Sequence, residues 1–259
     1  MRFACAVEYD GEAFSGWQRQ AHARSVQAAV EHALSYVADH PVEVSCAGRT
    51  DAGVHATWQV VHFDTDARRS ERSWLLGANA NLPDDVRLLR VQPVDEGFHA
   101  RFSARARSYR YVILNRDVPS ALLRHRVAWE HRPLDEQRMQ EGADYLLGEH
   151  DFSSFRAVAC QARNPVRTLH RLTVARHGDR VCLDVEANAF LHHMVRNIAG
   201  VLMTVGRGER PAQWVDEVLQ HRDRTRGGVT APAGGLYLVG VRYPEHFGVA
   251  PRGVVPGCG

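Results

Sequence analysis

The sequence predicts an α+β fold that is built from two similar halves. Short runs in which apolar and polar residues alternate are typical of half-buried strands, and longer runs carry apolar residues at the spacing of amphipathic helices. In about the first hundred residues the expected order is strand, helix, strand, strand, helix, strand. The second half follows a similar order without repeating the residues. This element order predicts two ferredoxin-like halves.

In the first half, the best-marked element is a helix. Ser25 is a suitable N-cap, residues 26–37 supply one apolar stripe, and Pro41 ends the helix. The strand before it ends in the turn signal Tyr9-Asp10-Gly11. The expected elements are, in order, a strand at 2–9, a helix at 25–39, strands at 42–46 and 58–63, a helix at 71–79 and a strand at 86–91.

The loop between the first strand and the helix contains Phe14, Trp17 and Arg19. Exposed aromatic rings beside arginine and amide side chains are typical of surfaces that stack and hydrogen-bond nucleotides. Alternatively, the two rings belong to the core. The sequence supports both interpretations equally.

The second half has no linker rich in proline, glycine or serine before it. We therefore expect the two halves, which resemble RNA-recognition modules in element order, to join into one mixed, mainly antiparallel sheet with helices on one face. The expected domains are 1–104 and 105–247, followed by an irregular tail at 248–259. The expected elements are strands at 108–115, 167–176, 181–188 and 236–243 and helices at 134–147, 190–205 and about 211–220.

The composition excludes several classes of function. The chain has 259 residues and a net charge of +2, and all 32 of its basic residues are arginine, which rules out Schiff-base and P-loop lysine chemistry. Its five cysteines are scattered without a Cys-x-x-Cys pair, which favours reduced thiols in a cytoplasmic protein. There is no apolar run long enough to span a membrane, and the first residues lack a signal-peptide core. The sequence shows no cofactor motif and no metal-ligand spacing, so we expect neither a cofactor nor a metal.

The stretch 47–56 lies between two expected strands and is therefore a loop. Gly48 and Gly53 allow tight turns and close approach by another molecule. Asp51 lies between them, two residues after Arg49. On these local features alone, Asp51 is a turn former whose side chain bonds its own backbone.

Eight short strings occur together in one order between residue 7 and about residue 243. They are Tyr9-Asp10-Gly11, Phe14-Ser15-Gly16-Trp17-Gln18-Arg19-Gln20, Gly48-Arg49-Thr50-Asp51-Ala52-Gly53-Val54-His55-Ala56, Phe98-His99-Ala100-Arg101-Phe102-Ser103-Ala104, Arg107-Ser108-Tyr109-Arg110-Tyr111, Asp151-Phe152-Ser153-Ser154-Phe155, Phe190-Leu191-His192-His193-Met194-Val195-Arg196-Asn197 and Ala231-Pro232-Ala233-Gly234-Gly235-Leu236-Tyr237-Leu238. This set resembles the signature of the tRNA pseudouridine synthase A family. The resemblance implies the pseudouridine synthase fold.

The resemblance assigns a role to each of five residues. Asp51 matches the catalytic aspartate, and Arg196 matches a basic residue that pairs with it and keeps it ionised. Tyr109 matches a base-stacking tyrosine, although on alternation alone it is a core residue of its strand. Leu236 matches an apolar residue of the uracil pocket, and Arg49 is expected to help stabilise a flipped-out nucleotide.

Helical spacing adds an expectation about the surroundings of Arg196. Counting about 100° per residue over 190–205 places His192, His193, Arg196 and Asn197 on the arc opposite the apolar stripe. Eight arginines lie in 99–132, where they could also contact phosphates.

The resemblance implies an isomerase that converts uridine to pseudouridine at positions 38 to 40 of the anticodon arm of tRNA. It also implies a homodimer in which each tRNA touches both subunits. Two other functions fit parts of the sequence. A non-catalytic RNA-binding protein of two recognition-type modules explains the element order but gives Asp51 no role. A hydrolase that uses Asp51 with His55 or His62 lacks a second carboxylate at a suitable spacing.

Overall fold

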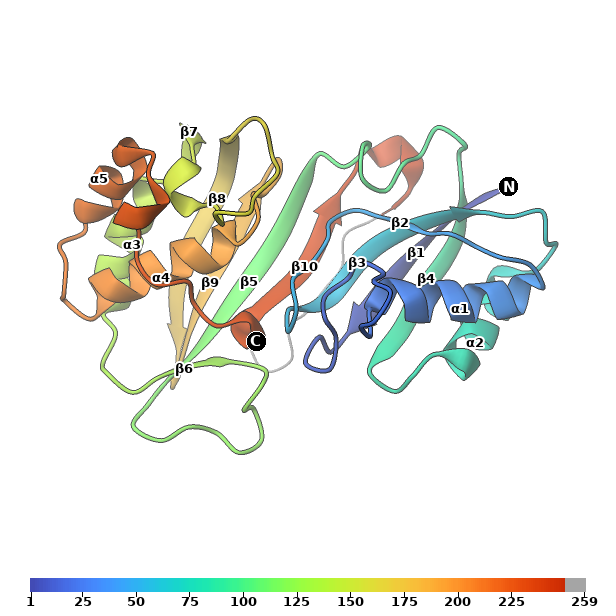
Figure 1. Ribbon diagram of the computed structural model, residues 1–259, viewed down its shortest axis with the longest axis horizontal. Helices are drawn as coiled ribbons and strands as arrows, with labels where there is room; N and C mark the ends of the chain where they lie inside the picture. The colour runs from blue at the N-terminus through green and yellow to red at the C-terminus, as the bar shows by residue number, and fades with distance from the viewer. Residues whose placement is uncertain (250–259) are drawn as a thin grey trace. The chain divides into compact units, whose positions relative to one another are not determined.

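The computed structural model describes residues 1–249, which form two compact units. Of the described residues, unit 1 contains Met1–Ala106 together with 237–249, and unit 2 contains Arg107–Leu236 (Figure 1). The segment 237–249 therefore belongs to the same unit as the N-terminal part of the sequence. Most of the expected tail, 248–259, lies outside the described residues.

Unit 1 has the sheet order of a ferredoxin-like fold. Strand β1 lies between β4 and β3 and is antiparallel to both, and β2 is antiparallel to β3. Phe3 faces Phe63 across β1 and β3, and Trp74 packs against both rings. The strands are β1 (Arg2–Tyr9), β2 (Ser45–Cys46), β3 (His55–Asp64) and β4 (Val86–Val94).

The helices of unit 1 are α1 (Val26–Ala38) and α2 (Glu71–Asn81), which pack against each other and against β4 (Figure 1). The side chain of Ser25 accepts a hydrogen bond from the amide of Ala28, which confirms the predicted cap. Ser70 caps α2 in the same way, through the amide of Ser73. Both helices confirm the sequence prediction.

The outer edge of β3 is divided between two strands. At one end, Ser45 and Cys46 of β2 pair with His62 and Val61. At the other end, β10 (Leu236–Arg242) runs parallel to β3, with Tyr237 opposite His55. The loop 47–54 therefore leaves the sheet between these two pairings.

In unit 2, β9 lies between β5 and β8 and is antiparallel to both, and β7 continues this strand order beyond β8. A short strand, β6, pairs with β5 in parallel. The predicted α+β class with mainly antiparallel pairing is thus confirmed. The strands are β5 (Ala106–Asn115), β6 (Ala128–Glu130), β7 (Gly148–Asp151), β8 (Val166–His177) and β9 (Arg180–Ala187).

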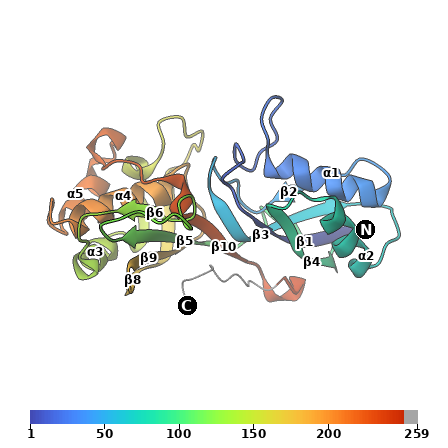
Figure 2. The same cartoon turned by 90° about the horizontal axis from the view of Figure 1, so that it is seen from below.

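The helices of unit 2 pack against one another, and α3 also packs against β8 (Figure 2). They are α3 (Glu136–Asp144), α4 (Met194–Gly206) and α5 (Trp214–His221). Single 3₁₀ turns occur in unit 2 at η1 (Ser153–Phe155), η2 (Arg224–Arg226) and η3 (Ala233–Gly235), and in unit 1 at η4 (Glu245–Phe247). In the part of the chain that the structure describes, no helix has the length and apolar character needed to cross a membrane.

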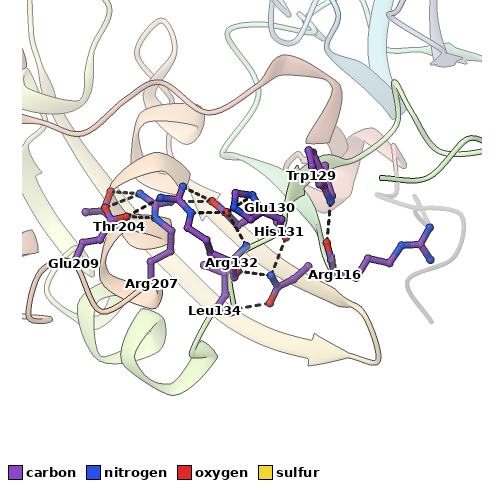
Figure 3. Close-up of polar contacts among 10 residues, drawn as sticks. Arg116, Trp129, Glu130, His131, Arg132, Leu134, Thr204, Arg207 and Glu209 are labelled. Atoms are coloured by element: carbon purple, nitrogen blue, oxygen red, sulfur yellow. Dashed lines mark hydrogen bonds and ion pairs between the residues drawn. The ribbon is translucent and has the colours of Figure 1, made fainter. Parts of the chain in front are cut away.

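A network of ion pairs joins β6 to the end of α4 in unit 2 (Figure 3). The carboxylate of Glu130 is buried and accepts hydrogen bonds from the guanidinium groups of Arg132, at 2.9 Å, and Arg207, at 3.2 Å. Glu209 bonds the same two arginines at 2.9 and 2.8 Å. The two arginines hold the pKa of Glu130 below its ordinary value even though burial acts in the opposite direction.

His62 carries a testable consequence for stability. Its ring is buried and its Nδ1 accepts the amide of Ala100, and burial lowers its pKa from 6.5 to about 4. Between pH 6.5 and about pH 4, His62 binds a proton in the unfolded chain but not in the folded chain. The free energy of unfolding therefore falls as the pH decreases through this range. We expect His62 to account for a loss on the order of 2 kcal/mol between pH 7 and pH 4.

Urea denaturation at a series of pH values, on the wild type and on His62→Asn, measures this contribution. Asparagine offers an oxygen to the amide of Ala100 but does not titrate, so the variant should lose less stability on acidification. Equal losses in the two proteins would contradict the assignment.

Candidate functional site

The start of the loop that carries Asp51 is held by contacts with β3. The amide of Ala47 donates to the carbonyl of Val60 at 2.8 Å. The buried side-chain amide of Gln59 bonds both the N–H and the carbonyl of Gly48. These contacts fix the start of the loop against the centre of the strand that follows it.

Asp51 occupies the first position of a tight turn. The amide of Val54 donates to the carbonyl of Asp51 at 3.1 Å, and Gly53 has φ = 75°. A positive φ at the third position is the signature of a type II turn, and glycine adopts it without strain. The turn is made by backbone atoms, so it does not depend on the carboxylate of Asp51, which is half-buried.

Residues 9–17, at the end of β1 and just after it, pack against the Asp51 loop and form its cradle. The hydroxyls of Tyr9 and Thr50 share a hydrogen bond of 2.8 Å, and the amide of Trp17 donates to the carbonyl of Thr50 at 3.0 Å. A Cβ atom added to Gly11 would lie 2.0 Å from the carbonyl oxygen of Val54. The backbones are therefore in direct contact, and only glycine permits this approach at position 11.

The aromatic rings of the 14–20 loop belong to the core. Phe14 and Trp17 are 3% and 1% exposed, so the interpretation as a nucleotide-stacking surface is wrong for these two rings. Their burial holds the loop in place, because the carbonyl of Phe14 accepts the amide of Gly53 at 3.4 Å. This stretch supports the Asp51 loop from below.

The two histidines considered for a hydrolase have structural roles. The Nδ1 atom of His55 accepts the amide of Gly11 at 3.0 Å and lies 3.1 Å from a carboxylate oxygen of Asp10. His62 holds the amide of Ala100, as described above. Both rings therefore tie backbone segments together, which removes the main support for the hydrolase interpretation.

Tyr109 lies on β5 of unit 2, opposite Val185 of β9. Its ring is 8% exposed and meets the ring of Phe190 edge to face, with the centroids 5.0 Å apart. Phe190 precedes α4, so the aromatic pair joins the strand to the start of that helix. The ring is therefore held in one orientation beside the start of α4.

Arg196 lies in the first turn of α4 and is tied to the segment before β10. Its Nε donates to the carbonyl of Ala231 at 2.8 Å, and the amide of Ala231 donates to the carbonyl of Arg196 at 3.1 Å. These two hydrogen bonds fix the position of the guanidinium group at its Nε atom. They are not visible in the sequence because the partners are 35 residues apart.

The helix differs from the prediction at its N-terminus. It begins at Met194 and not at Phe190, because His193 adopts a left-handed backbone conformation with φ = 62°. His192 and His193 therefore precede the helix and do not share its polar arc. Asn197, which helical spacing placed on the arc opposite the apolar stripe, is buried, with 1% exposure.

Asn197 organises the segment that precedes β10. Its amide donates to the carbonyl of Phe155 at 2.7 Å, and its oxygen accepts from Thr230 at 2.7 Å and from Arg224 at 3.1 Å. A Cβ on Gly200 would lie 1.8 Å from the carbonyl oxygen of Val229, so the segment lies directly on α4. These residues were not predicted as functional, and their signal in the sequence was a polar residue and a glycine inside a helical pattern.

Leu236 begins β10 directly after η3 and is buried. The segment before it is fixed to β5, because the hydroxyl of Tyr111 donates to the carbonyl of Pro232 at 2.8 Å. Gly235 lies close to β5 as well, with its added Cβ only 2.8 Å from the carbonyl oxygen of Val112. Tyr111 is therefore a core residue with a structural hydrogen bond.

Of the five candidate residues, Arg49 and Asp51 lie on unit 1 and Tyr109, Arg196 and Leu236 lie on unit 2.

Some of the eight arginines in 99–132 form ion pairs with acidic residues of the same unit. Arg110 pairs with Asp184 at 2.6 Å, and Arg132 pairs with Glu130. These two arginines are therefore less suited to bind phosphates than the sequence suggested.

Comparison with known proteins agrees with these motifs. A family model described as tRNA pseudouridine synthase matches residues 5–103 and 143–244. The two matched ranges contain the Asp51 loop, Arg196 and Leu236, whereas Tyr109 lies between them.

Several curated proteins named tRNA pseudouridine synthase A are similar to this chain over nearly its whole length. The one from Methylococcus capsulatus is 64% identical over 250 residues, which are 96% of this chain and 92% of that protein. The one from Nitrosococcus oceani is 60% identical and covers 95% of each chain. The one from Shewanella amazonensis is 53% identical over 99% of this chain and 98% of that protein.

Proposed function

Because this chain belongs to the tRNA pseudouridine synthase family, we propose that it isomerises uridine to pseudouridine at positions 38 to 40 of the anticodon arm of tRNA. The observation that carries the proposal is the Asp51 loop. Its backbone is fixed from both sides by Gln59 and by the cradle of Gly11 and Trp17, so that one carboxylate has a defined place. The isomerisation has no redox or hydrolytic step, so its main requirements are such a carboxylate and a closed pocket for the base.

The reaction breaks the bond between C1′ of the sugar and N1 of uracil, turns the base, and joins C1′ to C5. The proton on C5 leaves, and N1 gains a proton, so the product has the mass of the substrate. Asp51 serves either as the nucleophile that takes the glycosyl group or as the base that removes a proton from the sugar. Both routes depend on the same carboxylate.

We propose that each of the other four candidate residues contacts either the substrate or Asp51. Tyr109 stacks on the uracil ring and Leu236 supplies an apolar wall. Arg196, whose root is fixed by Ala231, pairs with the carboxylate of Asp51 and keeps it ionised. Arg49, which is exposed on the Asp51 loop, stabilises the flipped nucleotide.

We also propose that the protein acts in the cytoplasm as a homodimer, with each tRNA in contact with both subunits. A dimer explains how a chain of 259 residues reads the shape of a large RNA. Sedimentation equilibrium measures the mass of the free protein, and a monomer at micromolar concentration would contradict this part of the proposal.

The activity is tested by release of tritium from transcribed tRNA that carries uridine labelled at C5. The proposal predicts release together with an intact RNA strand. Tight binding of tRNA by folded protein without any release would instead indicate a non-catalytic RNA-binding protein.

Tyr109 provides a test of the stacking role. Tyr109→Phe keeps the ring, so we expect it to retain most of kcat/KM. Tyr109→Leu keeps an apolar side chain but removes the π-face, and we expect a loss of about 5- to 100-fold, the range of one base–aromatic stack. Steady-state kinetics on the same tRNA measures both, and equal values for the two variants would contradict stacking.

A further inference from the structure

The proposed reaction gives no role to Phe102, although this aromatic side chain projects from the surface. It is 75% exposed, which is unusual for so large an apolar side chain. It lies in the string Phe98-His99-Ala100-Arg101-Phe102-Ser103-Ala104, one of the eight motifs of the sequence, on unit 1.

The turn that carries Phe102 is rigid. The Nδ1 atom of His99 accepts the amides of Arg101, at 3.1 Å, and Phe102, at 3.3 Å. The amide of Ser103 donates to the carbonyl of His99 at 2.9 Å, and the hydroxyl of Ser103 accepts the amide of His99 at 3.0 Å. A single imidazole ring therefore fixes the backbone at the position of the exposed phenyl ring.

The base of the turn is anchored in the core of unit 1. The hydroxyl of Tyr243 donates to the carbonyl of Ala100 at 2.6 Å, and the ring of Phe98 packs against Tyr243 with the centroids 4.9 Å apart. The Arg2 guanidinium donates to the carbonyl of Phe98 at 2.9 Å. These three contacts hold the base of the turn, so Phe102 keeps a defined position.

The surroundings of Phe102 suit a nucleotide. One side of the ring packs on the ring of His99 at 4.3 Å, and the guanidinium of Arg101 lies 5.6 Å from the ring centroid. Arg105, which is exposed, follows on the same segment, and residues 97–116 contain no aspartate or glutamate. An exposed ring beside a guanidinium group offers a π-face for a base and positive charge for its phosphate.

The turn also lies near the loop that carries Asp51. The guanidinium groups of Arg49 and Arg101 both act on the thiol of Cys46, where they oppose the rise that burial causes in its pKa. Cys46 is the last residue of β2, from which the Asp51 loop departs. Arg49 and Arg101 therefore both lie within electrostatic range of Cys46.

We propose that Phe102, with Arg101, is a stacking platform for a second unpaired nucleotide of the RNA substrate, distinct from the uridine that reacts. This inference rests on the proposed function, since it names a further contact to the same RNA. The platform holds the nucleotide by base stacking on the phenyl ring and by a phosphate contact to the guanidinium. It gives affinity without base identity, because every base has a π-face.

Phe102→Ala tests the platform, with Tyr36→Ala as the matched control. Tyr36 is 70% exposed on α1, so its removal deletes an equally exposed ring from the same unit. We expect Phe102→Ala to weaken the Kd for transcribed tRNA by about 5- to 100-fold, the range of one stacked base, and to raise KM more than it lowers kcat. Phe102→Trp should bind as tightly as the wild type, and Tyr36→Ala should be unchanged.

Two further measurements separate stacking from other causes. Arg101→Gln should weaken binding and lower the slope of log Kd against log salt by about one. The added tryptophan emission of Phe102→Trp should be quenched by tRNA, whereas that of Tyr36→Trp should not. Because position 102 is exposed, thermal denaturation should show folded protein in every case.

The outcomes distinguish this inference from the proposed function. Wild-type Kd values for Phe102→Ala overturn the platform while tritium release by the wild type upholds the enzyme. Binding losses in Phe102→Ala without tritium release from the wild type uphold the platform and overturn the enzyme. A change of sedimentation mass in Phe102→Ala would place the ring at a contact between copies of the chain and overturn the platform.

Discussion

Asp51→Ala is expected to nearly abolish tritium release, with a loss of about 100- to 10,000-fold in kcat, while the Kd for tRNA stays close to that of the wild type. The carboxylate takes part in the chemistry as nucleophile or as base, a contribution commonly worth two to four orders of magnitude. The turn around Asp51 is closed by backbone atoms, from the amide of Val54 to the carbonyl of Asp51, so alanine leaves it in place. The substitution removes chemistry and not phosphate contacts.

Asp66→Ala is the matched control for this variant. Asp66 is exposed shortly after the end of β3, on the same unit, and its removal should leave kcat unchanged. Single-turnover measurements at saturating tRNA compare the two proteins directly. If Asp51→Ala retained as much as about a tenth of the wild-type rate, the central role of this carboxylate would be wrong.

Gly11→Ala is expected to have the second-largest effect, although it is not a reacting residue. The added methyl group would lie 2.0 Å from the carbonyl oxygen of Val54, so the Asp51 loop must move away from β1. A displacement of about 1 Å at the carboxylate costs on the order of 100-fold in rate. Overpacking of this kind also lowers the free energy of unfolding by about 1 to 3 kcal/mol.

Gly178→Ala separates the loss of rate from the loss of stability. Gly178 lies in the turn between β8 and β9, with φ = 59° and no atom within 4 Å of an added Cβ. Alanine there strains the backbone and lowers stability, but the Asp51 loop is untouched. Urea denaturation should show that both variants are destabilised, whereas kcat should fall only in Gly11→Ala; a normal kcat in Gly11→Ala would mean that the cradle does not position Asp51.

Local patterns predicted the elements well where a single segment determines them. Ser25 and Pro41 mark the ends of α1, and the alternation in 167–188 predicted both strands of the β8–β9 hairpin. The α+β class followed from the order of these elements. The short strands β6 and β7 were missed because three or four residues carry too little periodicity to be seen.

The candidate site was predicted less completely, because its supports come from distant parts of the chain. The resemblance supplied Asp51, but nothing near it indicated that Gly11 and Trp17 would form its cradle. Helical spacing placed Asn197 on the arc opposite the apolar stripe, yet it is buried, because Phe155, Arg224 and Thr230 satisfy its amide. Helical spacing alone cannot foresee such partners, and it cannot foresee a left-handed residue such as His193 that delays the start of a helix.

The most direct test of the account is to map modified uridines in bulk tRNA before and after treatment with the purified protein. Conversion of uridine to pseudouridine at positions 38 to 40 by the wild type, with intact strands and none by Asp51→Ala, is the predicted result. Released uracil, cleaved strands or unmodified uridine at all three positions would contradict it.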